Sequence, residues 1–176
     1  MSDYLFKEVQ TFRQKILWIL LSIITIGSIA LFVINYLNTM NDGTNSSDIS
    51  LFGLILVTMF TSFLLWFFYK IELIISINSN SINYTFWPFI RDTKKIRFEN
   101  IHSIYVGKYK PIREYGGWGY RLSLKGRGLC LNVSGSQGIR IKMNDGYELL
   151  LGTQKKEELI KTLNNLNLQS IKYEYN

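Results

Sequence analysis

The chain has 176 residues, a formal net charge of +7 and 47% hydrophobic residues, and its apolar residues are concentrated in two long blocks near the N-terminus. The single cysteine excludes an internal disulfide, and the single histidine excludes a histidine-rich metal site. A basic surplus of this size fits nucleic acid, an anionic lipid surface or an acidic protein as partner.

Residues 1–15 carry apolar side chains at helical spacing. Leu5, Val9 and Phe12 precede Ile16 at intervals of three or four residues. This spacing predicts a cytoplasmic amphipathic segment, a short helix that lies on the inner membrane surface and runs into the first apolar block. The alternative is a frayed polar tail.

Two stretches without a charged residue follow, residues 16–37 and residues 51–69. At about 1.5 Å per residue, each can cross a hydrocarbon core of about 30 Å. A chain this short cannot hide two such helices in a soluble core. We therefore expect transmembrane helix 1 at 16–37, a short external loop at 38–50 and transmembrane helix 2 at 51–69.

The residues inside and beside these stretches indicate an anchor with a defined orientation. Neither stretch holds an ionisable residue, which disfavours a transporter or an ion pathway. Arg13 and Lys15 precede the first stretch, Lys70 follows the second, and the loop between them has no Lys or Arg. Positive charge favours the cytoplasmic side, so both termini are expected there. Small and hydroxyl-bearing residues are expected to let the two helices pack closely: Ser22, Thr25, Gly27, Ser28, Thr58, Thr61 and Ser62.

After Lys70 the hydrophobic period changes to two, which predicts strands. The expected strands lie near 71–77, 82–87, 94–98, 102–108, 118–123, 129–133, 139–143 and 147–151. The sequence Asn144-Asp145-Gly146 predicts a hairpin turn, and the segment 111–119 is expected to be irregular. The last element is an amphipathic helix that Thr153 caps, with a stripe of Leu159, Leu163 and Leu166.

This order predicts a mainly-β domain at 70–176: an antiparallel barrel of seven or eight strands, with the C-terminal helix covering an open end. It is the pleckstrin-homology-like (PH-like) arrangement. The chain also resembles a group of uncharacterised small bacterial membrane proteins with two transmembrane helices and a bacterial PH-like domain. The resemblance lies in residues 109–121, 132–135 and 151–155. It implies a PH-like fold and a multi-pass protein of the bacterial cytoplasmic (inner) membrane, and it implies no particular function.

No catalytic constellation is visible in the sequence. Cys130 lies between leucines and is expected to be a packed small residue, while His102 is expected on a strand surface. Zinc would need two or more carboxylates in addition to these two residues. We therefore expect no enzymatic activity, no metal and no cofactor.

The segment 113–121 is the most unusual part of the chain, because arginines and aromatic residues alternate there with Gly116, Gly117 and Gly119. One interpretation is a ligand or peptide site; the other is a β-bulge whose Trp118 and Tyr120 plug the barrel. The basic residues of the strands are either solvated or in contact with anionic headgroups. The candidate ligand- or partner-binding residues are Arg113, Tyr115, Trp118, Arg121, Arg140 and Lys142.

These observations favour a non-enzymatic, membrane-anchored PH-like interaction module that binds a protein or anionic-lipid partner at the inner membrane face. Membrane lipids contact the two helices in this hypothesis, and nucleic acid is not expected because no recognised binding motif is present. The alternative is a homo-oligomeric membrane assembly or scaffold protein. A small-ligand-binding or enzymatic protein is a weaker alternative.

Overall fold

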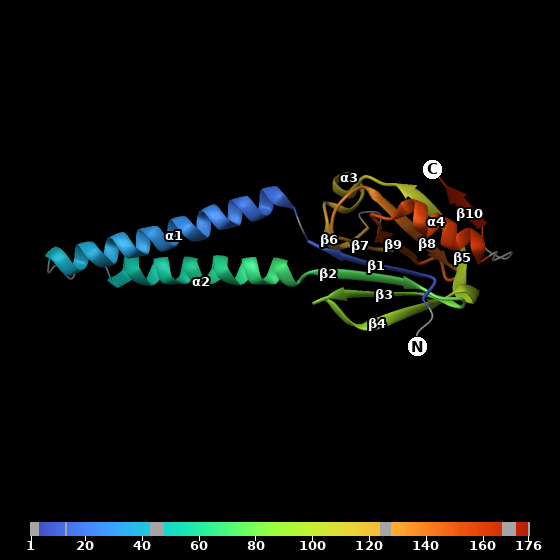
Figure 1. The fold of residues 1–176 in the computed structure, drawn as a ribbon, viewed down its shortest axis with the longest axis horizontal. Coiled ribbons are helices and arrows are strands. Elements are labelled where there is room, and N and C mark those ends of the chain that lie inside the picture. The colour runs from blue at the N-terminus through green and yellow to red at the C-terminus, as the bar shows by residue number, and fades with distance from the viewer. Residues whose placement is uncertain (1–3, 13, 43–47, 124–127, 167–171, 176) are drawn as a thin grey trace. The chain divides into compact units, whose positions relative to one another are not determined.

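The computed structural model describes residues 4–12, 14–42, 48–123, 128–166 and 172–175. The chain divides into two compact units: Arg13–Lys70, and Met1–Phe12 together with Ile71–Asn176. The first unit is helical and the second is mainly β (Figure 1).

The helical unit consists of α1 (Lys15–Asp42) and α2 (Asp48–Lys70). Both are long and apolar enough to cross a membrane, over Lys15–Asn38 and Phe52–Lys70. Large apolar side chains such as Ile23, Phe60 and Phe63 are exposed on these helices. In water such a continuous apolar surface is unfavourable, whereas lipid tails can cover it.

Hydroxyl-bearing residues lie in the contact between α1 and α2. Thr25, Ser28 and Thr61 are buried, and the Thr58 hydroxyl donates a hydrogen bond to Ser28 Oγ at 3.1 Å. All four of these hydroxyls are also hydrogen-bonded to a carbonyl of their own helix, as Thr25 is to Leu21 O at 2.8 Å. The expected close packing is therefore confirmed at these positions, whereas Gly27 and Ser62 lie on exposed faces.

Two sheets and two short helices form the β domain (Figure 1). The first sheet has the antiparallel order β1-β2-β3-β4, with β1 (Phe6–Thr11), β2 (Glu72–Ile77), β3 (Ser81–Trp87) and β4 (Ile90–Arg97). The second has the order β10-β5-β8-β9-β7-β6, with β5 (Ile101–Lys108), β6 (Gly119–Leu122), β7 (Gly128–Asn132), β8 (Gln137–Met143), β9 (Glu148–Gly152) and β10 (Lys172–Tyr175). The remaining elements are a 3₁₀ turn at Phe98–Asn100, α3 (Pro111–Tyr115) and α4 (Lys156–Asn165).

Both sheets contribute to the main core, and alternate residues of β2 and β8 are almost completely buried. Leu73, Ile75 and Ile77 come from β2, and Ile139 and Ile141 come from β8. This alternation is the period of two that the sequence shows. The hairpin β8–β9 is also confirmed: Gly146 has a φ of 86°, and its N–H donates to Met143 O at 3.0 Å.

The closed antiparallel barrel of seven or eight strands is wrong. The described residues form ten strands in two separate sheets, and two strand pairs are parallel, β10 with β5 and β7 with β9. Two strands were missed by the sequence analysis, β1 ahead of the helices and β10 after α4. Two apolar helices near the N-terminus and a mainly-β domain are confirmed, but the domain also includes β1 ahead of the helices.

The predicted amphipathic helix at 1–15 is wrong as well, because Phe6–Thr11 is the strand β1. Leu5 and Val9, which carry the helical pattern, are exposed, whereas Glu8 and Gln10 are buried. Glu8 accepts hydrogen bonds from the Thr153 hydroxyl at 2.6 Å and from the backbone N–H of residue 154 at 2.7 Å. These bonds offset the cost of burying a carboxylate, so tertiary contacts decide the conformation of this segment.

The structure also differs from two predictions about single elements, the irregular segment 111–119 and the N-cap of the C-terminal helix. The segment expected to be irregular begins with the helix α3, and α4 has Lys155 at its N-cap instead of Thr153. Thr153 Oγ1 accepts the N–H of Lys155 at 3.0 Å while its hydroxyl donates to Glu8. Leu159 and Leu163 are buried as the helical stripe requires.

Candidate functional site

The helix α3 has clear start and stop signals. Pro111 stands at its first position, where the missing N–H costs nothing. Gly116 ends it in the left-handed conformation with a φ of 72°, which residues with a Cβ rarely adopt. The N–H groups of Gly116 and Gly117 donate to Ile112 O and Pro111 O at 2.9 and 3.0 Å. The glycines therefore end a helix, and the β-bulge interpretation does not apply to them.

An aromatic cluster fixes α3 on the second sheet. Tyr109, Tyr115, Cys130 and Leu150 are buried together, and the two tyrosine rings meet edge to face with their centroids 6.2 Å apart. Burial raises the pKa of both phenols and raises the pKa of the Cys130 thiol to about 12. The thiol is consequently protonated at neutral pH, which suits packing and not nucleophilic attack.

Two facing glycines make room for the Tyr109 ring. Gly138 of β8 pairs with Gly152 of β9. A Cβ at Gly138 would lie 2.8 Å from Leu151 O and 3.2 Å from Cε1 of Tyr109, so a larger residue would force the strands or the ring to move. Asn132 Nδ2 donates to the Tyr109 hydroxyl at 2.7 Å, which satisfies this buried phenol oxygen.

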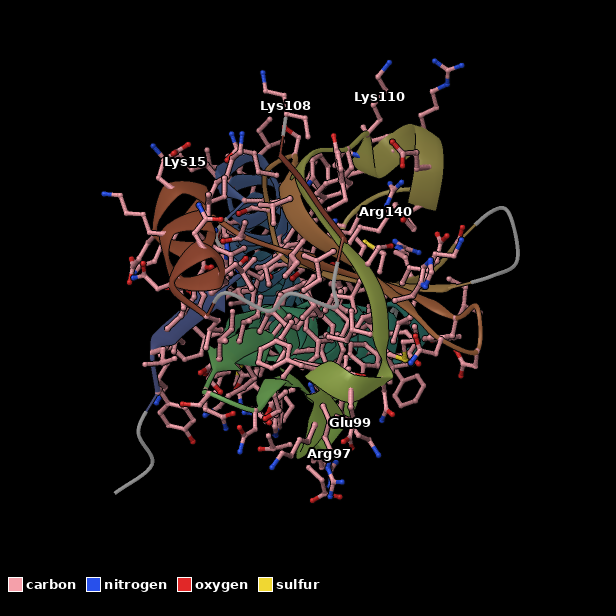
Figure 2. The ribbon with its side chains drawn as sticks, turned by 90° about the vertical axis from the view of Figure 1, so that its right-hand side faces the viewer. Lys15, Arg97, Glu99, Lys108, Lys110 and Arg140 are labelled. Carbon is pink, nitrogen blue, oxygen red and sulfur yellow. The ribbon has the colours of Figure 1, made fainter. Side chains whose placement is uncertain are left out.

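Glu114 connects α3 to β8. One carboxylate oxygen accepts the backbone N–H of Lys110 at 2.8 Å, and the other pairs with Arg140 at 2.8 Å. Both side chains of this ion pair are 35% exposed. Figure 2 shows Arg140 directly below α3. Both oxygens of the Glu114 carboxylate are therefore bonded within the domain, and Arg140 stabilises the fold through its ion pair with Glu114.

An open groove runs beside α3, with a volume of about 730 Å³. One wall is residues 110–114, the other is Gly135 and Ser136, and Tyr109 and Trp118 also line it. The indole N–H of Trp118 donates to Gly135 O at 2.8 Å, so its ring is held between the two walls. We call this hollow the α3 groove.

Three cations surround the α3 groove, namely Lys108, Lys110 and Arg113. Among the residues that the structure describes, none of the three forms an ion pair with a carboxylate. Ile112 lies among them with its side chain 68% exposed. The arrangement combines uncompensated positive charge with apolar surface, and it suits an anionic partner that also carries an apolar group.

The predicted site residues are divided between different environments. Arg113 and Trp118 line the α3 groove, while Tyr115 is buried beneath it. The exposed Arg121 donates through Nε to Trp118 O at 3.1 Å, and Lys142 is exposed on β8 and does not line the groove. Tyr120 is 40% exposed, so it does not plug the domain.

Lys108, Lys110 and Ile112 line the α3 groove but are not among the predicted site residues. A signal was present, because Lys108 and Lys110 alternate with the buried Tyr109 immediately ahead of Pro111. Alternation of this kind exposes the two lysines on either side of a buried residue. Their proximity to Trp118 and Gly135 depends on the packing of β8 and could not be read from spacing.

A second hollow of about 480 Å³ lies at Ser79, Asn80, Lys95, Arg97, Phe98 and Glu99. Arg97 is paired there with Glu99 at 3.1 Å, so its charge is compensated. Figure 2 shows Arg97 and Glu99 on the opposite side of the domain from Lys108 and Lys110. Within the described ranges, no three His, Cys, Asp or Glu residues gather as metal ligands do.

Comparisons with protein-family models, with curated proteins and with solved structures give no match for this chain.

Proposed function

We propose that this chain is a non-enzymatic, membrane-anchored interaction module whose PH-like β domain binds a protein or anionic-lipid partner at the inner face of a bacterial membrane. The observation that carries the proposal is the α3 groove, where Lys108, Lys110 and Arg113 surround Ile112 without a paired carboxylate among the described residues. An open groove with uncompensated charge is typical of a binding surface.

The connection of the helices to the domain supports the anchoring. β1 precedes α1 and β2 follows α2, and these two strands pair from Phe6↔Ile77 to Thr11↔Glu72. Strands of one sheet lie in the same compartment, so the chain between them crosses a membrane an even number of times. Arg13, Lys15 and Lys70 flank the helices and favour the cytoplasmic side for the domain.

The PH-like assignment is part of the proposal. Two stacked sheets, one of them antiparallel throughout, and a helix after the last long hairpin support it. The parallel pairs β10/β5 and β7/β9 are departures from a simple antiparallel barrel. A homo-oligomeric scaffold stays an alternative prediction that sizing in mild detergent would test.

Photocrosslinking in native membranes tests the proposed function. A photoreactive amino acid at Ile112, which is 68% exposed in the α3 groove, is expected to capture a protein or a phospholipid. The matched control is the same amino acid at Phe89, which is 53% exposed and does not line the groove. Products identical to those of the control would contradict the proposal.

A further inference from the structure

We infer that the α3 groove binds an acidic segment of a partner protein, with carboxylates beside Lys108, Lys110 and Arg113 and an apolar side chain between Ile112 and Trp118. This inference rests on the proposed function, since it names the class of partner and the surface that recognises it.

The charge of the α3 groove selects an anion. Three cations line it, and its one carboxylate, Glu114, is already bonded to Lys110 N and to Arg140. The cations are therefore available to an incoming ligand, while the carboxylate that would repel an anion is neutralised. Charge complementarity of this kind favours acidic partners and excludes basic ones.

The groove is large enough to hold a short segment of a chain. α3 forms one wall, Gly135 and Ser136 form the other, and a volume of about 730 Å³ is open to solvent between them. Trp118 is held in place by its bond to Gly135 O, so its ring presents a fixed apolar surface. Covering the exposed side chain of Ile112 removes further apolar area from water. A peptide with one apolar residue among acidic ones matches both features.

A lipid surface fits the groove less well. Residues that enter a bilayer surface usually form a protruding apolar face with several large side chains. Here Ile112 is the one large apolar side chain of α3 that is exposed, and Trp118 lies in a hollow. Lysines around the groove would still attract anionic headgroups, so the experiment must distinguish lipid binding from peptide binding.

The test uses the full chain in phosphatidylcholine nanodiscs and a random-peptide library displayed on phage. The groove variant is Lys110→Glu with Arg113→Glu. The control is Lys94→Glu with Lys95→Glu, which makes the same change of charge on exposed residues of β4. Lys110→Gln with Arg113→Gln is a milder second variant, and thermal unfolding checks that each variant is folded.

We expect the selected peptides to be acidic, to carry at least one apolar residue, and to bind the original chain and the control equally. Binding to the groove variant should weaken about tenfold or more, and it should also weaken as salt is raised. No selected peptide, peptides without acidic residues, or equal binding to the groove variant would overturn the inference.

Flotation with phosphatidylglycerol vesicles separates the lipid outcome. Binding of vesicles that is lost in the groove variant, with no peptide selected, would overturn the peptide inference and leave the proposed function standing. A protein captured at Ile112 in native membranes through a segment that is not acidic would have the same consequence. Failure of peptide selection, flotation and crosslinking together would contradict the proposed function itself.

Discussion

Neighbouring side chains of α3 have different roles. Tyr115 packs against Tyr109 in the buried cluster, whereas Ile112 and Arg113 are exposed at the groove. Glu114 lies between these environments and bonds to both Lys110 N and Arg140. Substitutions of Tyr115 and Glu114 therefore report on folding, and substitutions of Ile112 and Arg113 report on binding.

Replacing Glu114 by Ala should lower the free energy of unfolding of the domain by about 1 kcal/mol, because a charged acceptor of two hydrogen bonds is lost. The partial exposure of the pair keeps the effect small, although Arg140 Nε is buried without a partner among the described residues. The control Glu99→Ala removes a more exposed ion pair and should change the free energy by less than about 0.5 kcal/mol. Denaturant unfolding in detergent measures both; equal losses would contradict the structural role of Glu114.

The Cys130 thiol should be inert toward a thiol reagent in the folded protein at pH 8. Burial raises its pKa to about 12, so the thiolate that reacts is almost absent, and the reagent cannot reach it. Reaction should become fast when denaturant unfolds the domain. Rapid reaction of the folded chain would contradict this.

The raised pKa of the Cys130 thiol also predicts that the stability of the domain depends on pH. An unfolded thiol loses its proton near pH 9, while the folded thiol keeps it up to about pH 12. The unfolded state therefore binds fewer protons between these values, and the contribution of Cys130 to stability is present below pH 9 and declines above it. A Cys130→Ala variant should show a smaller decline between pH 9 and 11 in thermal unfolding.

At the scale of elements, hydrophobic patterning and turn residues predicted correctly those elements that depend on residues close together in the chain. The charge-free stretches lie within α1 and α2, and the Asn144–Gly146 turn joins β8 and β9. α3 was missed although Pro111 and Gly116 are standard helix boundary residues. Its five residues give no apolar stripe that a pattern search can find.

β1 could not be predicted, because its inward positions are partly polar. Glu8 and Gln10 are stabilised in the interior by hydrogen bonds to Thr153, residue 154 and Gly152, more than 140 positions away.

The candidate site could be predicted only in part for the same reason, because it also depends on contacts between residues far apart in the chain. Arg113 and Trp118 were found from composition, whereas the role of Arg140 depends on Glu114, 26 positions away.

Replacing Glu8 by Ala should lower the free energy of unfolding by about 2–3 kcal/mol, because the Thr153 hydroxyl and a backbone N–H lose a charged acceptor in a buried place. The control is Lys7→Ala, on the exposed face of the same strand. Hydrogen exchange should also show β1 amides protected in the parent and faster in the Glu8 variant. Equal stability of both variants would contradict the placement of β1 in the sheet.

At the scale of the whole molecule, the helical hairpin is an insertion between two adjacent strands of one sheet. Phe12 N donates to Ile71 O at 3.3 Å, so the two points where the chain leaves and re-enters the domain are neighbours. The sequence has no Asp, Glu, Lys, Arg or His between Ile16 and Leu37 or between Phe52 and Tyr69. These features favour a membrane anchor that joins the domain at two neighbouring points of one sheet.

Cysteine labelling in intact bacterial cells tests the membrane arrangement most directly. In a Cys130→Ala background, single cysteines replace Ser46 in the sequence between α1 and α2, Lys7 on β1 and Ser79 after β2. A membrane-impermeant maleimide should label Ser46→Cys in intact cells, and it should label Lys7→Cys and Ser79→Cys only after the membrane is permeabilised. Labelling of Lys7→Cys or Ser79→Cys from outside would contradict a β domain assembled from both flanks of the helices at the inner membrane face.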